Sequence, residues 1–191
     1  MKDLSLHILD IAQNSITAGA KRLDLELAEE GGRITLTVAD DGSGMAPELL
    51  ARVSDPFTTT RTTRKVGLGL PLLRLTAEQT GGSLAIESTL GVGTTVTARF
   101  QRRHLDCPPL GDLAGTVALL IQGSPEMELT YRHTTPRGEA ALSTAELRDI
   151  LGDVSLAEPE VFAWIQDYLT EQENDAAADA FPAAGIEGEI T

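Results

Sequence analysis

The sequence predicts an α+β fold in two layers, with helices packed on an antiparallel sheet. Residues 3–20 repeat apolar side chains at helical spacing, which is typical of a helix lying on a core. Four later segments within the first hundred residues alternate apolar and polar side chains, as half-buried strands do. Glycine pairs separate these segments where tight turns are needed. Elements that each bury one apolar face in this way form a two-layer α/β sandwich.

The first helix, expected over residues 3–20, has a second face that is polar throughout. That face recurs at steps of four and three residues and consists of Asp3, His7, Asp10, Asn14 and Thr17. Residues four apart on a helix lie one above the other, so Asp10 and Asn14 point into the same space. A carboxylate and an amide in that arrangement can serve an attacking hydroxyl and a metal ion. A solvated helix face has the same pattern, and the helix alone does not distinguish the two.

The remaining elements of the first hundred residues follow in order from periodicity and turn residues. We expect strands at 22–27 and 34–38 paired as an antiparallel hairpin, a loop at 40–45, a helix at 47–53, a functional loop at 54–66, a helix ending near 79, and strands at 84–86 and 94–100. Gly19 is the expected C-cap of the first helix.

Pro108 and Pro109 mark the boundary region between the first hundred residues and a small α+β extension, which we expect over residues 105–170. It is expected to hold helices at 113–121, 144–151 and 161–169, with short strands at 128–133 and 139–142. The extension has no dense cluster of Cys, His or carboxylate residues, so we interpret it as an interaction module. Residues 171–191 are acidic and Ala-rich, and we expect them to be a disordered tail.

The composition excludes several kinds of protein. The formal net charge of the 191 residues is -14, which argues against a nucleic-acid-binding surface. The single cysteine, Cys107, excludes an intrachain disulfide and favours a reducing compartment. No apolar run approaches the length of a membrane span. We therefore expect a soluble, cytoplasmic protein that binds neither nucleic acid nor a membrane.

Three glycine clusters follow the first helix: Gly42/Gly44, Gly67/Gly69 and Gly91/Gly93. Glycine lets a backbone approach a ligand closely, so that N–H groups surround a phosphate or a nucleobase. Each cluster taken alone is more often an ordinary turn. None forms a P-loop, because no Gly-Lys-Ser/Thr occurs, and none opens a dinucleotide-binding βαβ unit.

Taken in order, five motifs resemble the N, G1, F, G2 and G3 boxes of the GHKL ATPases. That superfamily includes gyrase, a chaperone ATPase, the histidine kinases and the MutL proteins. The motifs are DIAQNSITAGA at 10–20, DDGSG at 40–44, DPFTTT at 55–60, GLGL at 67–70 and GVGT at 91–94. The resemblance implies a Bergerat-type sandwich and an ATP-binding domain over residues 1–104. The first box is similar to the MutL version, and the third and fourth resemble the histidine-kinase and anti-sigma-kinase branch.

The resemblance implies a role for each motif in binding Mg·ATP. Asn14 would ligate Mg²⁺ through its amide oxygen, and Asp40 would accept a hydrogen bond from the adenine amino group. Thr94 would lie near Asp40 at the adenine end. The G1 glycines would pass under the base, and the G2 glycines would hold phosphates at the N-terminus of the next helix. The residues expected to bind ATP are Asn14, Asp40, Gly42, Gly44, Met45, Phe57, Arg64, Lys65, Gly67, Leu68, Gly69, Leu70 and Thr94.

Asp10 and Asn14 are the expected catalytic residues. Asp10 stands where MutL-like and anti-sigma-kinase members carry a glutamate general base, four residues before the asparagine. Aspartate is one methylene shorter, and a general base must come within about 3 Å of the proton it accepts. The lid cations Arg61, Arg64 and Lys65 are able to neutralise the triphosphate, although a solvated loop has the same composition.

No phosphoacceptor domain is expected, because the N-box helix begins at residue 3. The three histidines, His7, His104 and His133, lack the acidic neighbour of an acceptor box. The leading hypothesis is therefore a histidine-kinase-like protein that phosphorylates a separate partner protein in signalling. One alternative is a MutL-like ATPase whose lid closure regulates a partner, and another is a nucleotide-sensing module that never hydrolyses ATP. A homodimer is compatible with each.

Overall fold

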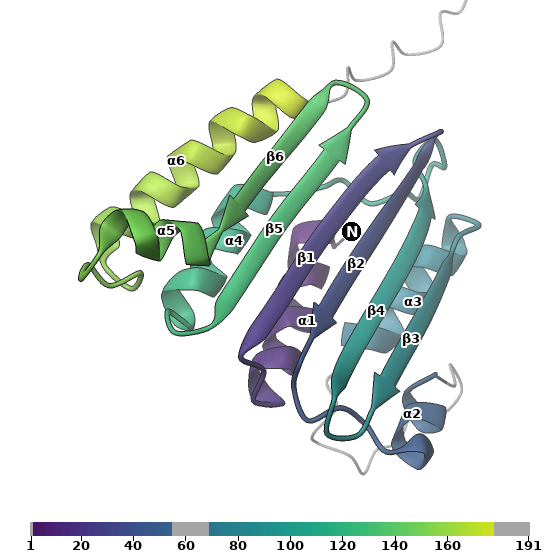
Figure 1. Ribbon diagram of the computed structural model, residues 1–191. Helices are drawn as coiled ribbons and strands as arrows, with labels where there is room; N and C mark the ends of the chain where they lie inside the picture. Colours follow the sequence, from purple (N-terminus) through teal and green to yellow (C-terminus); the bar gives the residue numbers. More distant parts are fainter. Residues whose placement is uncertain (1, 55–68, 178–191) are drawn as a thin grey trace, which may run out of the picture.

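The computed structural model describes residues 2–54 and 69–177, and a six-stranded sheet dominates it (Figure 1). The elements in chain order are α1 (Leu4–Thr17), β1 (Arg22–Glu30), β2 (Arg33–Asp40), α2 (Pro47–Ser54), α3 (Gly69–Gln79), β3 (Ser83–Thr89), β4 (Gly93–Gln101), α4 (Leu113–Gly123), β5 (Glu128–Thr135), β6 (Gly138–Ser143), α5 (Thr144–Leu151) and α6 (Pro159–Ala176). The α+β, two-layer sandwich predicted from the sequence is confirmed.

The sheet is mixed, with strand order β3-β4-β2-β1-β5-β6. The four strands of the first hundred residues pair with one another in antiparallel fashion, as predicted. β5 then pairs with β1 in parallel, and β6 returns antiparallel to β5. The strands of the extension therefore continue the same sheet, and β1 lies in the interior of the sheet rather than at an edge.

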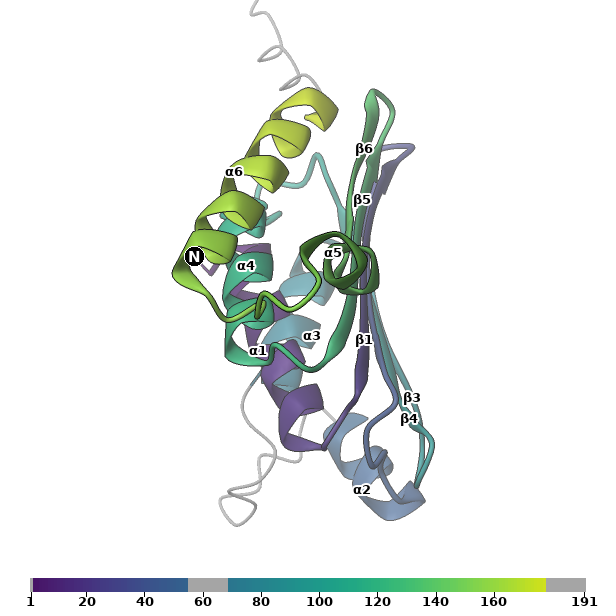
Figure 2. The same cartoon turned by 60° about the vertical axis from the view of Figure 1, so that its left-hand side comes forward.

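Helices α1, α3, α4 and α6 cover one face of the sheet (Figure 2). The alternation along each strand explains this, because its apolar members all face the helices. The inward side chains of β1, β2 and β4 are Leu23, Leu25, Leu27, Ile34, Leu36, Val38, Val96, Ala98 and Phe100. Across the described ranges, no helix combines the length and apolar character that crossing a bilayer requires.

The local chemistry of α1 fixes where this helix begins and ends. The carboxylate of Asp3 accepts the Leu6 N–H at 3.0 Å, which caps the first turn. The helix ends at Thr17 and its C-cap is Ala18, one residue before the predicted cap Gly19, whose φ of 76° does not allow the helix to continue.

Residues 171–191 were predicted to be a disordered tail. This prediction is wrong for residues 171–176, because α6 continues to Ala176. Two side chains of this last stretch bind the sheet. Gln172 accepts the Ala141 N–H at 2.9 Å on the outer edge of β6, and Glu173 reaches His133 on β5. These contacts order a segment whose composition alone is typical of disorder. Residues 178–191 lie outside the described residues.

A buried ionic cluster joins α6 to the sheet. His133 is 1% exposed, and its two ring nitrogens lie 2.7 Å from Glu173 Oε2 and 3.1 Å from Glu29 Oε1. Tyr131 donates its hydroxyl to Glu173, and Arg102 pairs with Glu29 at 3.3 Å. Burial opposes the charged imidazolium, but the hydrogen bonds and charges of the two glutamates outweigh it and raise the pKa of His133 to about 9.

We predict that His133 makes the stability of the protein depend on pH. A pKa raised from 6.5 to about 9 stabilises the fold fully below about pH 6.5, and this contribution is lost as the pH rises to about 9. The free energy of unfolding, measured in urea, should fall by about 3 kcal/mol between pH 6 and pH 9. His133→Gln should abolish most of this dependence, whereas His104→Gln, at an exposed site, should retain it. An equal dependence in the wild type and His133→Gln would contradict the assignment.

Candidate functional site

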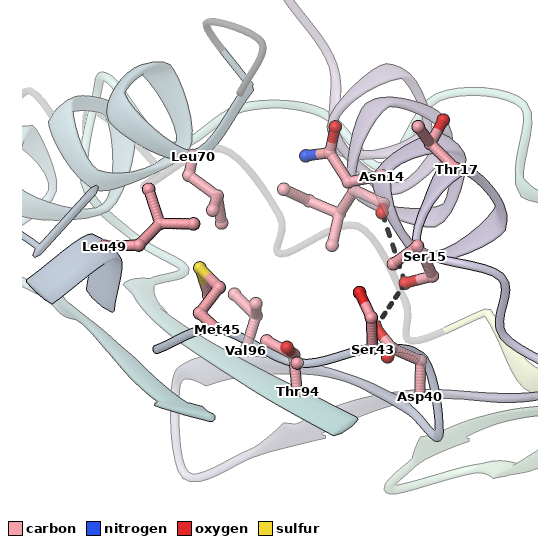
Figure 3. Close-up of a pocket in the computed structure, with 13 residues that line it drawn as sticks. Asn14, Ser15, Thr17, Asp40, Ser43, Met45, Leu49, Leu70, Thr94 and Val96 are labelled. Atoms are coloured by element: carbon pink, nitrogen blue, oxygen red, sulfur yellow. Dashed lines mark hydrogen bonds between the residues drawn. The ribbon is translucent and has the colours of Figure 1, made fainter. Parts of the chain in front are cut away.

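A pocket of about 630 Å³ lies between the helical layer and the end of β2. It is bounded by α1, the loop after β2, α2, the start of α3 and β4 (Figure 3). Its lining residues are Ile11, Asn14, Ser15, Thr17, Ala18, Asp40, Ser43, Gly44, Met45, Leu49, Leu70, Thr94 and Val96. Apolar atoms form most of the exposed lining surface, and six of the thirteen lining residues have polar side chains, a mixture that suits a small-molecule site.

Asp40, at the end of β2, is held from two directions. Ser15 of α1 donates its hydroxyl to Asp40 Oδ2 at 2.6 Å (Figure 3). The Gly42 N–H donates to Oδ1 at 2.9 Å. Each carboxylate oxygen has a second lone pair, so the group can still accept a hydrogen bond from a ligand. The carboxylate is therefore a preorganised acceptor at the pocket wall.

Thr94 lies directly opposite Asp40 in the β2–β4 register. Its hydroxyl is 2.8 Å from Ser88 Oγ, and the same Ser88 oxygen accepts the Met45 N–H at 2.8 Å. Ser88 on β3 thus ties the loop after β2 to the β3–β4 turn. The predicted proximity of Thr94 to Asp40 is confirmed by this register.

The glycines on either side of the pocket allow two turns to pack closely. Gly44 has a φ of 63°, and a Cβ there would lie 2.0 Å from the Thr89 carbonyl oxygen. A Cβ on Gly93, whose φ is 146°, would lie 2.0 Å from the Asp40 carbonyl oxygen. The Gly91 N–H donates to the Ser43 carbonyl at 2.7 Å. Close backbone packing therefore requires Gly44 and Gly93 even without a ligand.

The polar stripe of α1 divides into parts with different surroundings. Asn14 lines the pocket, and Asp10, one turn earlier, forms an ion pair with Lys2. A Cβ on Gly69, the first residue of α3, would lie 3.1 Å from Asp10 Cβ, so Asp10 lies beside the start of that helix. The pocket and the start of α3 are therefore connected along this face of α1.

His7 was expected on the polar face of α1, but its side chain is buried. Its Nε2 is 3.5 Å from the Thr76 hydroxyl of α3, and its Nδ1 has no hydrogen-bond partner among the residues that the structure describes. Burial, with a smaller contribution from the charge of Lys2, lowers the pKa of His7. His7 is therefore a neutral packing residue between α1 and α3.

The structure brings most of the predicted site residues into one place. Those that line the pocket are Asn14, Asp40, Gly44, Met45, Leu70 and Thr94. Gly42 binds the Asp40 carboxylate, and Gly69 packs beside Asp10. Five further residues, Phe57, Arg64, Lys65, Gly67 and Leu68, lie outside the described residues, as does Arg61 of the predicted loop.

Two residues of the site were not singled out from the sequence. Ser15 lies on the buried side of α1, and its hydroxyl, directly after Asn14, was an available signal. Ser88 lies on β3, and nothing in its own segment indicates a partner on the loop after β2. The apolar wall formed by Leu49 and Val96 was also not identified as part of a site.

Comparison with known proteins defines the class of this fold and site. Residues 2–104 match the family described as histidine kinase-, DNA gyrase B-, and HSP90-like ATPase. This match covers more than half of the chain, and the protein belongs to that family. Within it, the relatives support an ATP-binding module of the histidine-kinase kind.

The similar curated proteins are much longer than this chain. The histidine protein kinase DivJ of Caulobacter vibrioides is 39% identical in an alignment 91 residues long that covers 40% of this chain and 15% of DivJ. The sensor histidine kinase AruS of Pseudomonas aeruginosa is 34% identical over 134 residues, covering 64% of this chain and 13% of AruS. The fold is also similar to the N-terminal domain of a DNA repair protein, with a TM-score of 0.54, 15% identity, and coverage of 75% of this chain and 53% of that one.

We predict that alanine at Gly44 destabilises the protein more than alanine at Gly91. Both glycines have positive φ, 63° and 77°, but the Cβ of Gly44→Ala meets the Thr89 carbonyl, whereas that of Gly91→Ala enters open space. Gly91→Ala should cost about 1 kcal/mol of unfolding free energy from backbone strain, and Gly44→Ala about 3 kcal/mol or more. Urea denaturation measures both, and equal losses would show that the close approach to Thr89 is not maintained in solution.

Proposed function

We propose that this protein binds Mg·ATP in the pocket and transfers the γ-phosphoryl group to a separate partner protein. The observation that carries the proposal is the Asp40 carboxylate, held by Ser15 and the Gly42 N–H at the wall of a mostly apolar pocket. Family membership and the histidine-kinase relatives support the same assignment.

Recognition of adenine follows from the chemistry of this wall. An ionised carboxylate is an acceptor, so Asp40 favours a base that presents an amino group there. Adenine has an amino group at the position where guanine has a carbonyl, and a carbonyl oxygen facing the carboxylate would leave both groups unsatisfied. The apolar side chains of Met45, Leu49 and Val96 are suited to the faces of the ring. The pocket should therefore prefer ATP to GTP.

The residues present also suit a magnesium ion delivered with the triphosphate. Mg²⁺ in such sites takes one or two protein oxygens and obtains its other ligands from phosphates and water. The described residues contain no cluster of three His, Cys, Asp or Glu side chains able to hold a metal by themselves. Asn14, which faces the pocket, would supply an amide oxygen (Figure 3). A bound magnesium ion would neutralise charge on the phosphates.

The phosphates would extend along α1 towards the start of α3. The first N–H groups of a helix lack intrahelical acceptors and carry a partial positive charge, which favours anions. Gly69 begins α3 beside Asp10, so this helix terminus and the Asp10 carboxylate lie close together. Asp10 is thus suited to accept a proton from a hydroxyl of the partner protein as the phosphoryl group is transferred. Positioning by these groups would supply most of the rate enhancement.

Nucleotide binding is tested by calorimetry on the wild type and two site variants. The wild type should bind Mg·ATP at least tenfold more tightly than Mg·GTP, and Asp40→Asn should weaken Mg·ATP binding at least tenfold, because a hydrogen bond to a charged group is worth about 1.5–3 kcal/mol. Asn14→Ala should remove the dependence of affinity on Mg²⁺. Asp153→Asn, an exposed carboxylate after α5, is the control and should bind as the wild type does. Absence of binding by the wild type would refute the proposal.

Phosphoryl transfer is tested with ATP labelled at the γ-phosphate. We expect the label on a second protein when cell extract is supplied, and its loss with Asn14→Ala or Asp10→Ala, while Asp153→Asn retains it. Release of labelled phosphate with no labelled protein would instead indicate an ATPase. Binding without either product would indicate a nucleotide sensor, and both of these outcomes would contradict the kinase assignment.

A further inference from the structure

Lys2 occupies a defined place next to the proposed phosphate site. Its ammonium forms an ion pair with Asp10 Oδ2, and the two side chains are 32% and 43% exposed. The backbone that follows is fixed, because the N–H groups of Leu4 and Ser5 donate to the carbonyls of Pro109 and Leu110, both at 2.9 Å. Lys2 is therefore held where the chain enters α1, and its side chain extends along the helix as far as Asp10.

Apart from the start of α3, the described side chains at this end of the site offer an anion little positive charge. None of the described residues lining the pocket is a cation, and Asp40 places a negative charge at its wall. Asp10 adds a second carboxylate beside the start of α3. His7 does not compensate, because burial lowers its pKa and keeps it neutral. Among the described residues, Lys2 is the cation that contacts the Asp10 carboxylate, and its ammonium neutralises the charge of that carboxylate.

The geometry of α1 assigns Lys2 to one end of the ligand. Ser15, which binds Asp40, lies at the base-binding end, and Asp10 lies five residues earlier, about 7.5 Å further along the axis at 1.5 Å per residue. A triphosphate that runs from Asp40 past Asn14 towards α3 brings its last phosphate, rather than its first, to Asp10. Lysine has a flexible four-carbon stem and three N–H donors, so it can change partner without movement of the helix.

We infer that Lys2 is the residue that recognises the terminal phosphate of a bound nucleoside triphosphate, exchanging its ion pair with Asp10 for one with that phosphate. The inference rests on the proposed function, since it assigns one end of the same ligand. It adds to the proposed function that Lys2 makes the site bind a nucleoside triphosphate more tightly than the corresponding diphosphate.

The test compares the affinities of ATP and ADP, both with Mg²⁺, in protein carrying its purification tag at the C-terminus. Lys2→Met should weaken ATP binding about tenfold, the effect of losing one charge-assisted hydrogen bond, and ADP binding less than about twofold. Lys2→Arg should keep most of the difference between the two nucleotides. Lys21→Met, which removes an exposed lysine after α1, is the matched control and should leave both affinities unchanged.

Repeating the Lys2→Met comparison in protein that carries Asp10→Asn distinguishes direct contact of Lys2 with the phosphate from a role of Lys2 in positioning Asp10. In Asp10→Asn the ion pair is absent, so a purely structural role for Lys2 would leave the double variant binding ATP as Asp10→Asn does. Direct recognition requires Lys2→Met to weaken ATP binding about tenfold in this background too. Equal effects on ATP and ADP, or loss of the effect in Asp10→Asn, would overturn the inference. Absence of ATP binding by the wild type would instead refute the proposed function.

Discussion

The pocket depends on the close approach of two turns around the end of β2. Asp40 is the residue on which they converge: its carboxylate is bound by α1 and by the turn that follows, and its carbonyl oxygen lies against Gly93. Gly44 makes the reciprocal approach to Thr89 on the other side. Neither Gly44 nor Gly93 has room for a Cβ, so these contacts depend on the two glycines. The contacts are made by the protein alone, and they form the wall of the pocket without a ligand. The acceptor on that wall is preorganised as a consequence of how the sheet ends.

Much of the fold could be predicted from local signals. Period-two alternation located β1, β2 and β4, and turn glycines separated them, because each strand buries one face and needs a tight connection. The order of the motifs then indicated which segments meet, and Asn14, Asp40 and Thr94 do line one pocket. Their expected roles towards a nucleotide stay predictions, and all but the first residue of the predicted functional loop, 54–66, lies outside the described residues.

Other features depend on contacts between segments far apart in the chain, which have no local signature. The parallel pairing of β5 with β1 is one, since alternation identifies a strand but not its neighbour. The ion pairs of His133 with Glu29 and Glu173 are another, because an isolated glutamate gives no indication that it will be buried. For the same reason the composition of the last turn of α6 suggested disorder. The hydrogen bond from Ser15 to Asp40 is a further case, because nothing on α1 indicates that the end of β2 lies beside it.

The interior position of β1 has a consequence for synthesis of the protein. Asp24 on β1 and Thr130 on β5, which are hydrogen-bonded to each other, are separated by 106 residues. The ribosome needs about ten seconds to synthesise the residues between them, and during that time one edge of β1 has no partner strand. An open edge invites pairing with another nascent chain. The acidic residues that alternate with leucine along β1, Asp24 and Glu26 among them, would repel a second copy until β5 emerges.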